Sequence, residues 1–160
     1  MRKNSRYSDF LSTLMQKPDA AAQISYADNG EMPISGFVKF YQTRYGVLVA
    51  AHVRGLYSES DIFAFHIHSG NSCTGNADDP FADAMGHYNP ANVPHPSHAG
   101  DLPPLFSNSG YAFTVFLTDR FTVNEIIGKT VIIHSKPDDF TTQPSGNPGE
   151  KIARGIIKRI

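Results

Sequence analysis

Apolar and polar residues alternate over short segments from about residue 22 onward, and turn residues separate these segments. Two of them, ISGFVKFYQTRY and YGVLVAAHVRGLY, are joined by a tight turn, so we expect them to form a β-hairpin. Later segments with strand composition are GYAFTVFLTDRF, KTVIIH and KIARGIIKRI, with a short helical turn capped by Thr122 after the first. Seven or eight strands at short spacing predict an antiparallel sandwich or flattened barrel.

The first 20 residues follow a different pattern, and we expect them to be an extension of a single domain that spans residues 1–160. Their apolar side chains share one face of a helix: Phe10, Leu11, Leu14 and Met15. Ser8 is placed to cap this helix, which would end before Pro18. The pattern therefore favours a short N-terminal helix packed over one end of the barrel, with a frayed tail as the alternative.

Composition excludes several classes of function. The formal net charge is −1 and the sequence pI is about 6.6, so no basic excess indicates a nucleic-acid partner. No apolar run approaches the roughly 20 residues that a membrane-spanning helix needs. The stretch FLSTLM is too short and too interrupted for a signal peptide, which predicts a cytoplasmic location. Cys73 is the only cysteine, which excludes an intramolecular disulfide and agrees with a reducing compartment.

Histidines are concentrated between Phe65 and Asp101, a segment that contains five of the seven in the chain. His66 and His68 lie two apart in a strand-like run, and such residues point to the same face, so both rings can bind one ion. The loop that follows is rich in Pro, Gly, Asn and Ser, a composition that can bend several ligands around a metal. The further candidate ligands are His87, His95, His98, Asp101 and the distant His134. This spacing suggests two adjacent metal sites.

One histidine lies outside this pattern, and part of the pattern is shared with another class of metal site. His52 lies in the second strand of the hairpin with no partner motif nearby, so we expect it to be a structural or surface residue. A mononuclear enzyme of the cupin type would also begin with His-x-His on a strand. It would need a glutamate ligand nearby, and SGNSCTGN offers none.

Five separated motifs resemble the metal-binding signature of bacterial-type Cu/Zn superoxide dismutases, in that family's order: FHIH, GHYNP, HAGDL, GKTVIIHSKPDD and SGNPGEKIARGII. The resemblance covers the chain from about Ile34 onward. It implies an all-β, eight-stranded antiparallel Greek-key barrel with long metal-binding loops. It also implies dismutation of superoxide to molecular oxygen and hydrogen peroxide, at a copper site that a histidine bridges to a structural zinc site. A homodimer would be possible.

The resemblance implies a ligand set for each metal. Copper would be bound by His66, His68, His87 and His134. Zinc would be bound by His87, His95, His98 and Asp101, with the His87 ring bridging the two ions. Asp138 matches the family's carboxylate that hydrogen-bonds to one ligand of each metal. In the implied cycle His87 leaves copper, takes a proton and passes it to the forming peroxide.

The sequence departs from the family at two positions. Lys151 aligns with an arginine near copper, and a lysine can attract superoxide but lacks the planar fork that orients an anion. Arg154 stands where the family has one cysteine of a disulfide, so the order of the loop around Cys73 must come from zinc, Asp138 and packing. Lys136 is expected to be a solvated surface residue. These departures leave an alternative open, a copper- and zinc-binding member of the fold with weak or no dismutase activity.

Overall fold

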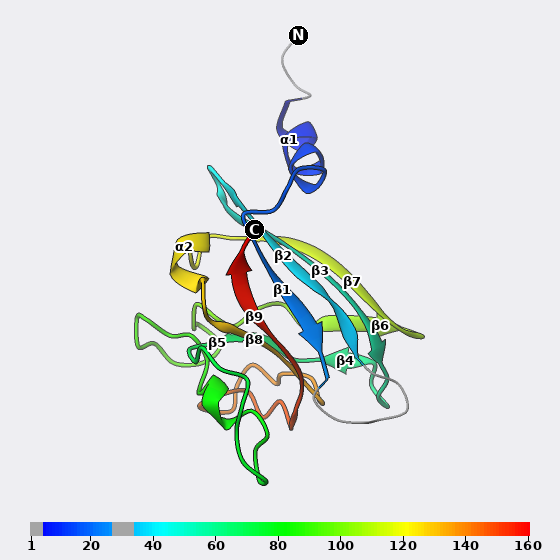
Figure 1. Ribbon diagram of the computed structural model, residues 1–160, viewed down its shortest axis with the longest axis vertical. Coiled ribbons are helices and arrows are strands. Elements are labelled where there is room, and N and C mark those ends of the chain that lie inside the picture. Colours follow the sequence, from blue (N-terminus) through cyan, green and yellow to red (C-terminus); the bar gives the residue numbers. More distant parts are fainter. Residues whose placement is uncertain (1–4, 27–33) are drawn as a thin grey trace.

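The structure, a computed structural model, describes residues 5–26 and 34–160 of the chain. Most of the described chain is in antiparallel strands joined by loops (Figure 1). The elements in chain order are α1 (Ser5–Leu14), β1 (Ala20–Ser25), β2 (Ser35–Thr43), β3 (Gly46–Leu56), β4 (Ile62–Phe63), β5 (Phe65–His68), the 3-10 helix η1 (Ala82–Ala84), β6 (Leu105–Asn108), β7 (Gly110–Thr118), α2 (Val123–Ile126), β8 (Thr130–His134) and β9 (Lys151–Arg159).

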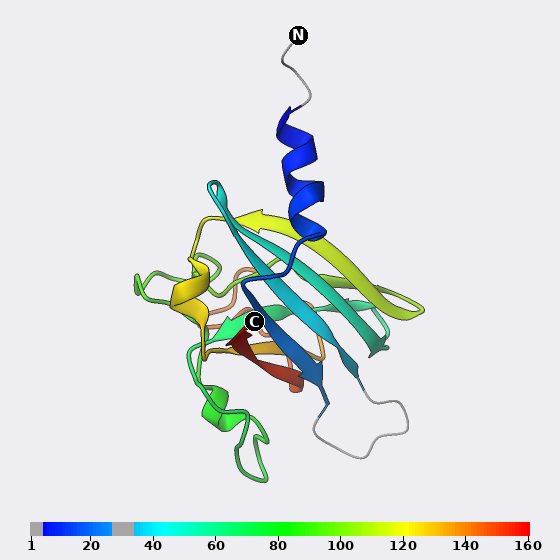
Figure 2. The same ribbon diagram turned by 45° about the horizontal axis from the view of Figure 1, so that its top comes forward.

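The nine strands form one sheet in the order β4-β6-β7-β3-β2-β1-β9-β8-β5. Its two ends, β4 and β5, are separated in the sequence by Ala64 alone, so the sheet curls into a nearly closed barrel (Figures 1 and 2). The neighbours β1–β9 and β3–β7 are far apart in sequence, as in a Greek key. The predicted fold class is confirmed, and the extra strand arises because β4 and β5 are two pieces of one extended stretch.

The predicted hairpin is formed by β2 and β3, which pair from Ser35↔Arg54 to Thr43↔Gly46. Gly46 has a φ of 124°, a conformation that suits glycine at this tight turn. Alternate side chains of these strands enter the barrel, where Val38, Phe40 and Val49 are fully buried. The apolar period in the sequence therefore sets which face of the sheet forms the core.

β5 is the strand that positions the candidate site, and both of its faces are buried. Phe65 and Ile67 belong to the apolar core, so alternation turns His66 and His68 toward the loops outside it. The neighbouring strand β8 ends at His134, whose backbone N–H donates to the carbonyl of Ala64 at 2.9 Å. Strand pairing thus brings His134 to the same end of the barrel as the β5 histidines.

The predicted N-terminal helix is present as α1, but Ser8 lies inside it, so the prediction that Ser8 caps the helix is wrong. Leu11 and Met15 are 70% and 88% exposed, and the Phe10 ring lies 6.0 Å from the ring of Tyr45. The helix projects beyond the barrel in both views (Figures 1 and 2) and so does not cover its end as predicted.

The predicted helical turn is α2, where the Thr122 backbone N–H donates to the Glu125 carboxylate at 2.6 Å. Among the helices of the described residues, none has the length and apolar character to cross a bilayer.

Substitutions of two neighbouring residues on β6 can test which side chains of this strand face the core of the barrel. Leu105 is fully buried and Phe106 is 66% exposed. Leu105→Ala should lower the free energy of unfolding by about 2–5 kcal/mol because it leaves a cavity in the core. Phe106→Ala should change it by about 0.5 kcal/mol or less. Urea unfolding of both variants checks this, and equal losses would contradict the described register of β6.

Candidate metal centre

Four histidines meet at the end of the barrel where β5 and β8 lie side by side. Each offers one ring nitrogen, and these nitrogens lie within 4.8 Å of one another. β5 and β8 supply three of these histidines, and the loop after β5 supplies His87. The backbones of His68 and His87 form an isolated bridge that holds this loop against β5. We call this set the four-histidine group: His66, His68, His87 and His134.

A second set of ligands lies directly beside the first, and its ligand atoms also lie within 4.8 Å of one another. We call it the Asp101 group: His87, His95, His98 and Asp101. The Asp101 carboxylate lies 3.0 Å from Nδ1 of His95 and 3.3 Å from Nδ1 of His98. Three imidazoles and one carboxylate form a donor set that suits tetrahedral zinc. The structure therefore brings all eight predicted ligand positions, with His87 counted in each set, into two groups.

His87 belongs to both groups through its two ring nitrogens. Its Nδ1 lies 2.7 Å from Oδ1 of Asp101 and 3.4 Å from Nδ1 of His98. Its Nε2 is buried and has no hydrogen-bond partner among the described residues. Since the ring of His87 lies 4.0 Å from the ring of His66, this second nitrogen belongs with the four-histidine group. The geometry is that of a ring placed between two cations.

The remaining nitrogens show which atom of each ring is available to a metal. His66 bonds Asp138 through Nε2 at 2.7 Å, which leaves its Nδ1. His68 donates through Nδ1 to the carbonyl of Met85 at 2.6 Å, which leaves its Nε2. That atom lies 3.4 Å from Nε2 of His134. Within the described part of the chain, the buried Nδ1 of His66 has no hydrogen-bond partner, and that of His95 lies 3.0 Å from the Asp101 carboxylate without the geometry of a hydrogen bond. Buried polar atoms are rarely left without a partner, so these residues fit bound metal ions.

The Asp138 carboxylate contacts one histidine of each group. Its Oδ2 lies 2.7 Å from Nε2 of His66, and its Oδ1 lies 2.9 Å from Nε2 of His95. Burial by itself raises the pKa of the Asp138 carboxyl, but hydrogen bonds from His66, the backbone N–H of Phe140 and His95 lower it overall. The carboxylate therefore stays ionised and fixes which nitrogen of each ring faces a metal.

Two residues that support the site were missed from the sequence. Arg120 donates from one guanidinium nitrogen to the carbonyls of Pro96, His98 and Asp101, each at 3.2 Å, and so holds the loop that supplies the Asp101 group. Gly146 has a φ of 78°, and a Cβ there would collide with the Asp138 carboxylate. Nothing local to Arg120 signals its role, whereas Gly146 lies in the motif SGNPG and could have been noticed.

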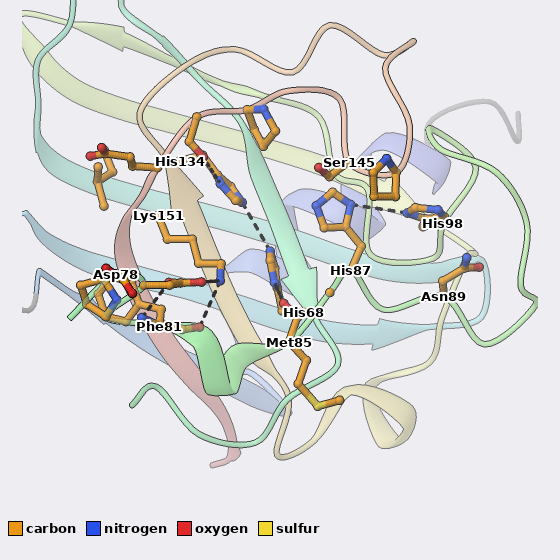
Figure 3. Close-up of a pocket in the computed structure, with 18 of the residues that line it drawn as sticks. His68, Asp78, Phe81, Met85, His87, Asn89, His98, His134, Ser145 and Lys151 are labelled. Atoms are coloured by element: carbon orange, nitrogen blue, oxygen red, sulfur yellow. Dashed lines mark hydrogen bonds and ion pairs between the residues drawn. The ribbon is translucent and has the colours of Figure 1, made fainter. Parts of the chain in front are cut away.

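A cavity of about 910 Å³ opens onto one side of the four-histidine group (Figure 3). His68, His87 and His134 line it, while His66 is fully buried. The charged residues among the described ones that line it are Asp78, Asp79, Glu150 and Lys151. The group is therefore open to a small molecule, through a mouth with more acidic than basic residues.

The predicted anion guide, Lys151, lies in the wall of this cavity but is ion-paired. Its Nζ lies 2.6 Å from Oδ2 of Asp79 and donates to the carbonyl of Phe81 at 3.1 Å. Lys136 and His52 are exposed, as predicted, and the His52 ring lies 5.0 Å from that of Tyr111.

Asp138 should control metal retention. In Asp138→Asn the amide NH₂ faces one of the two ring N–H groups, so one of the two hydrogen bonds is lost. Loss of such a partner typically costs 10–100-fold in metal affinity, so we expect weaker zinc retention by that factor. The matched control is Asp139→Asn, which changes an exposed neighbour. Zinc competition with a chromophoric chelator measures both, and equal retention would remove Asp138 from this role.

The metal-free protein should lose stability in mild acid. Burial lowers the pKa of His66, His68 and His134, in the last case to about 3. Below the unfolded-state pKa of about 6.5 the unfolded chain binds protons that the folded chain does not, so stability falls as the pH falls from about 6.5 toward 3. We expect a loss of at least about 1 kcal/mol between pH 7 and 5 in urea unfolding. His134→Asn should make this dependence shallower; a flat profile in the parent would contradict the prediction.

Comparison with known proteins agrees with the geometry. The family model described as copper/zinc superoxide dismutase matches residues 34–157. A Cu-Zn superoxide dismutase of Aquifex aeolicus is 31% identical over 81% of this chain and 82% of its own length. One of Legionella pneumophila is 33% identical, with 81% and 82% covered. The solved Cu/Zn superoxide dismutase of Brucella abortus has the same fold, with a TM-score of 0.73 at 24% identity over 86% of this chain and 98% of that one. The chain belongs to the copper/zinc superoxide dismutase family.

Proposed function

We propose that this protein dismutates superoxide to molecular oxygen and hydrogen peroxide. The four-histidine group would hold copper, and the Asp101 group would hold zinc. The single observation that supports this most directly is that His87 belongs to both groups, with Nδ1 2.7 Å from Asp101 and Nε2 left without a hydrogen-bond partner among the described residues. Family membership supports the same activity.

The donor atoms divide the two metals between the groups. Four imidazoles beside an open cavity suit a redox-active copper ion, and imidazole is a good ligand for it. The Asp101 group has its fourth position filled by a carboxylate and suits a closed zinc site. Zinc at Nδ1 of His87 would make the other ring nitrogen easier to deprotonate, because a nearby cation stabilises the anionic form of the ring.

Bound copper would supply the electron transfer, accepting one electron from a first superoxide and giving one to a second. His87 would supply proton transfer in the same cycle. Its Nε2 is buried beside the cavity, so it can hold a proton whenever it does not bind copper. His87 would then give that proton to the peroxide product, and solvent in the cavity would supply the second proton of hydrogen peroxide.

The charged residues in the cavity wall would affect how readily superoxide enters. Superoxide carries one negative charge, so Lys151 would favour its entry, while Asp78, Asp79 and Glu150 oppose it. The ion pair with Asp79 offsets part of the Lys151 charge. This observation favours the second candidate function, a copper- and zinc-binding protein with weak dismutase activity.

The proposal is tested by loading purified protein with one copper and one zinc per chain and following superoxide decay by stopped flow. We expect catalytic decay that depends on copper and is lost in His134→Asn. Full copper loading with no acceleration of decay would leave only the metal-binding function. The cytoplasmic location, the homodimer, and the absence of nucleic-acid and membrane partners stay predictions.

Lys151 should affect the rate through its charge. Lys151→Ala removes a cation and leaves the Asp79 carboxylate unpaired in the cavity wall, so superoxide decay should slow about threefold at low ionic strength. The difference should shrink as salt rises from about 0.01 to 1 M, over which the screening length falls from about 30 to 3 Å. Lys151→Arg keeps the charge and should match or exceed the parent.

Superoxide decay at matched copper content measures these variants. If Lys151→Ala equals the parent at low salt, attraction of the anion comes from other residues.

A further inference from the structure

The segment from Gly70 to Met85, which we call the 70–85 segment, lies against the barrel and ends beside the four-histidine group. Its Phe81 and Ala84 are buried with Ile132 of β8, and they form a small apolar cluster separate from the main core. At its end, the carbonyl of Met85 accepts the hydrogen bond from Nδ1 of His68. The position of this segment therefore bears on the orientation of a proposed copper ligand.

β9 holds the segment by charge. The ammonium of Lys151 lies 2.6 Å from the Asp79 carboxylate and donates to the carbonyl of Phe81 at 3.1 Å (Figure 3). Three residues along β9, the guanidinium of Arg154 lies 5.9 Å from the centre of the Phe81 ring. Two β9 cations thus hold the short run from Asp79 to Phe81, and Asp79 is 72 residues away from Lys151 in the sequence.

A continuous path leads from this contact to His68. The Phe81 carbonyl, which accepts from Lys151, also accepts the N–H of Ala84 at 3.0 Å. η1 follows, and the N–H of Met85 donates to the carbonyl of Ala82 at 3.0 Å. Met85 has a φ of 63°, an unusual value for a residue other than glycine, and persists there only if its surroundings fix it. A hydrogen-bonded turn that begins at Phe81 thus places the Met85 carbonyl against His68.

We propose that Asp79 and Lys151 form an ionic latch that fixes the 70–85 segment on β9 and, through Phe81 and the Met85 carbonyl, orients the His68 ring. Asp79 is then a positioning residue for the metal centre. The inference rests on the proposed function only in that His68 binds copper.

The two carboxylate oxygens of Asp79 have separate partners, which allows a clean test. Oδ1 accepts the backbone N–H of Phe81 at 2.9 Å, and Oδ2 accepts from Lys151. Asparagine at position 79 can keep the first bond through its carbonyl oxygen and removes the second together with the charge. Asp78→Asn is the matched control, because Asp78 is an exposed neighbour that lines the same cavity and carries the same charge.

The first measurement is hydrogen exchange of the 70–85 segment in metal-free protein, so it is independent of dismutase activity. Asp79→Asn and Lys151→Met should speed exchange of its amides about fivefold, as expected for loss of a partly exposed ion pair. Asp78→Asn and Lys151→Arg should behave like the parent, and amides of β1 to β3 should be unchanged in all variants. High salt should speed exchange of the segment in the parent but not in Asp79→Asn. Exchange in Asp79→Asn equal to that of the parent overturns the latch.

The second measurement tests the link to His68. Each variant is loaded with Cu(II) and zinc, and the electron paramagnetic resonance spectrum of copper is compared with that of the parent. We expect altered copper hyperfine coupling in Asp79→Asn, because the Met85 carbonyl no longer holds the His68 ring in one orientation, and a parent-like spectrum in Asp78→Asn. Faster exchange together with an unchanged copper spectrum in Asp79→Asn overturns the positioning role.

Discussion

The buried imidazoles at the end of the barrel are stable only if both nitrogens of each ring have partners. A buried polar atom without a partner costs free energy, and the cost applies to each nitrogen separately. The protein supplies a partner for one nitrogen of His66, His68 and His95, from the Asp138 carboxylate or the Met85 carbonyl. The other nitrogen of His68 faces His134, that of His95 faces the Asp101 carboxylate, and that of His66 has no hydrogen-bond partner among the described residues. This arrangement suits bound cations, which would give the nitrogens without hydrogen bonds a partner.

The same constraint explains how strands and loops share the site. β5 and β8 place three of the histidines through main-chain hydrogen bonds within the nearly closed barrel. The other ligands come from the long loop that ends at Asp101, and such a loop needs its own anchors. Arg120 provides one by binding three loop carbonyls. The ion pair of Lys151 and Asp79 provides another on the opposite side.

Among the described residues, one lysine and three acidic residues line the cavity beside the four-histidine group. Lys151 lies in the cavity wall, where its ammonium is ion-paired with the Asp79 carboxylate of the loop. The same residue is therefore the one that we propose both attracts superoxide and holds the loop. The chain has one cysteine, so loop order depends on non-covalent contacts.

Much of this protein is determined by its sequence alone. The two-residue period fixes the hairpin and the inward faces of the strands, and His-x-His on a strand places two rings on one face. The family's motifs identified the two ligand sets that the structure brings together. Only the tertiary structure decided the contacts between residues that are distant in sequence, because these contacts depend on which strands become neighbours around the barrel. The pairing of Lys151 with Asp79 and the contacts of Arg120 join residues far apart in the chain. The direction of α1 also depends on residues far apart in the chain, since the Phe10 ring lies 6.0 Å from the ring of Tyr45, and no local pattern specifies that neighbour.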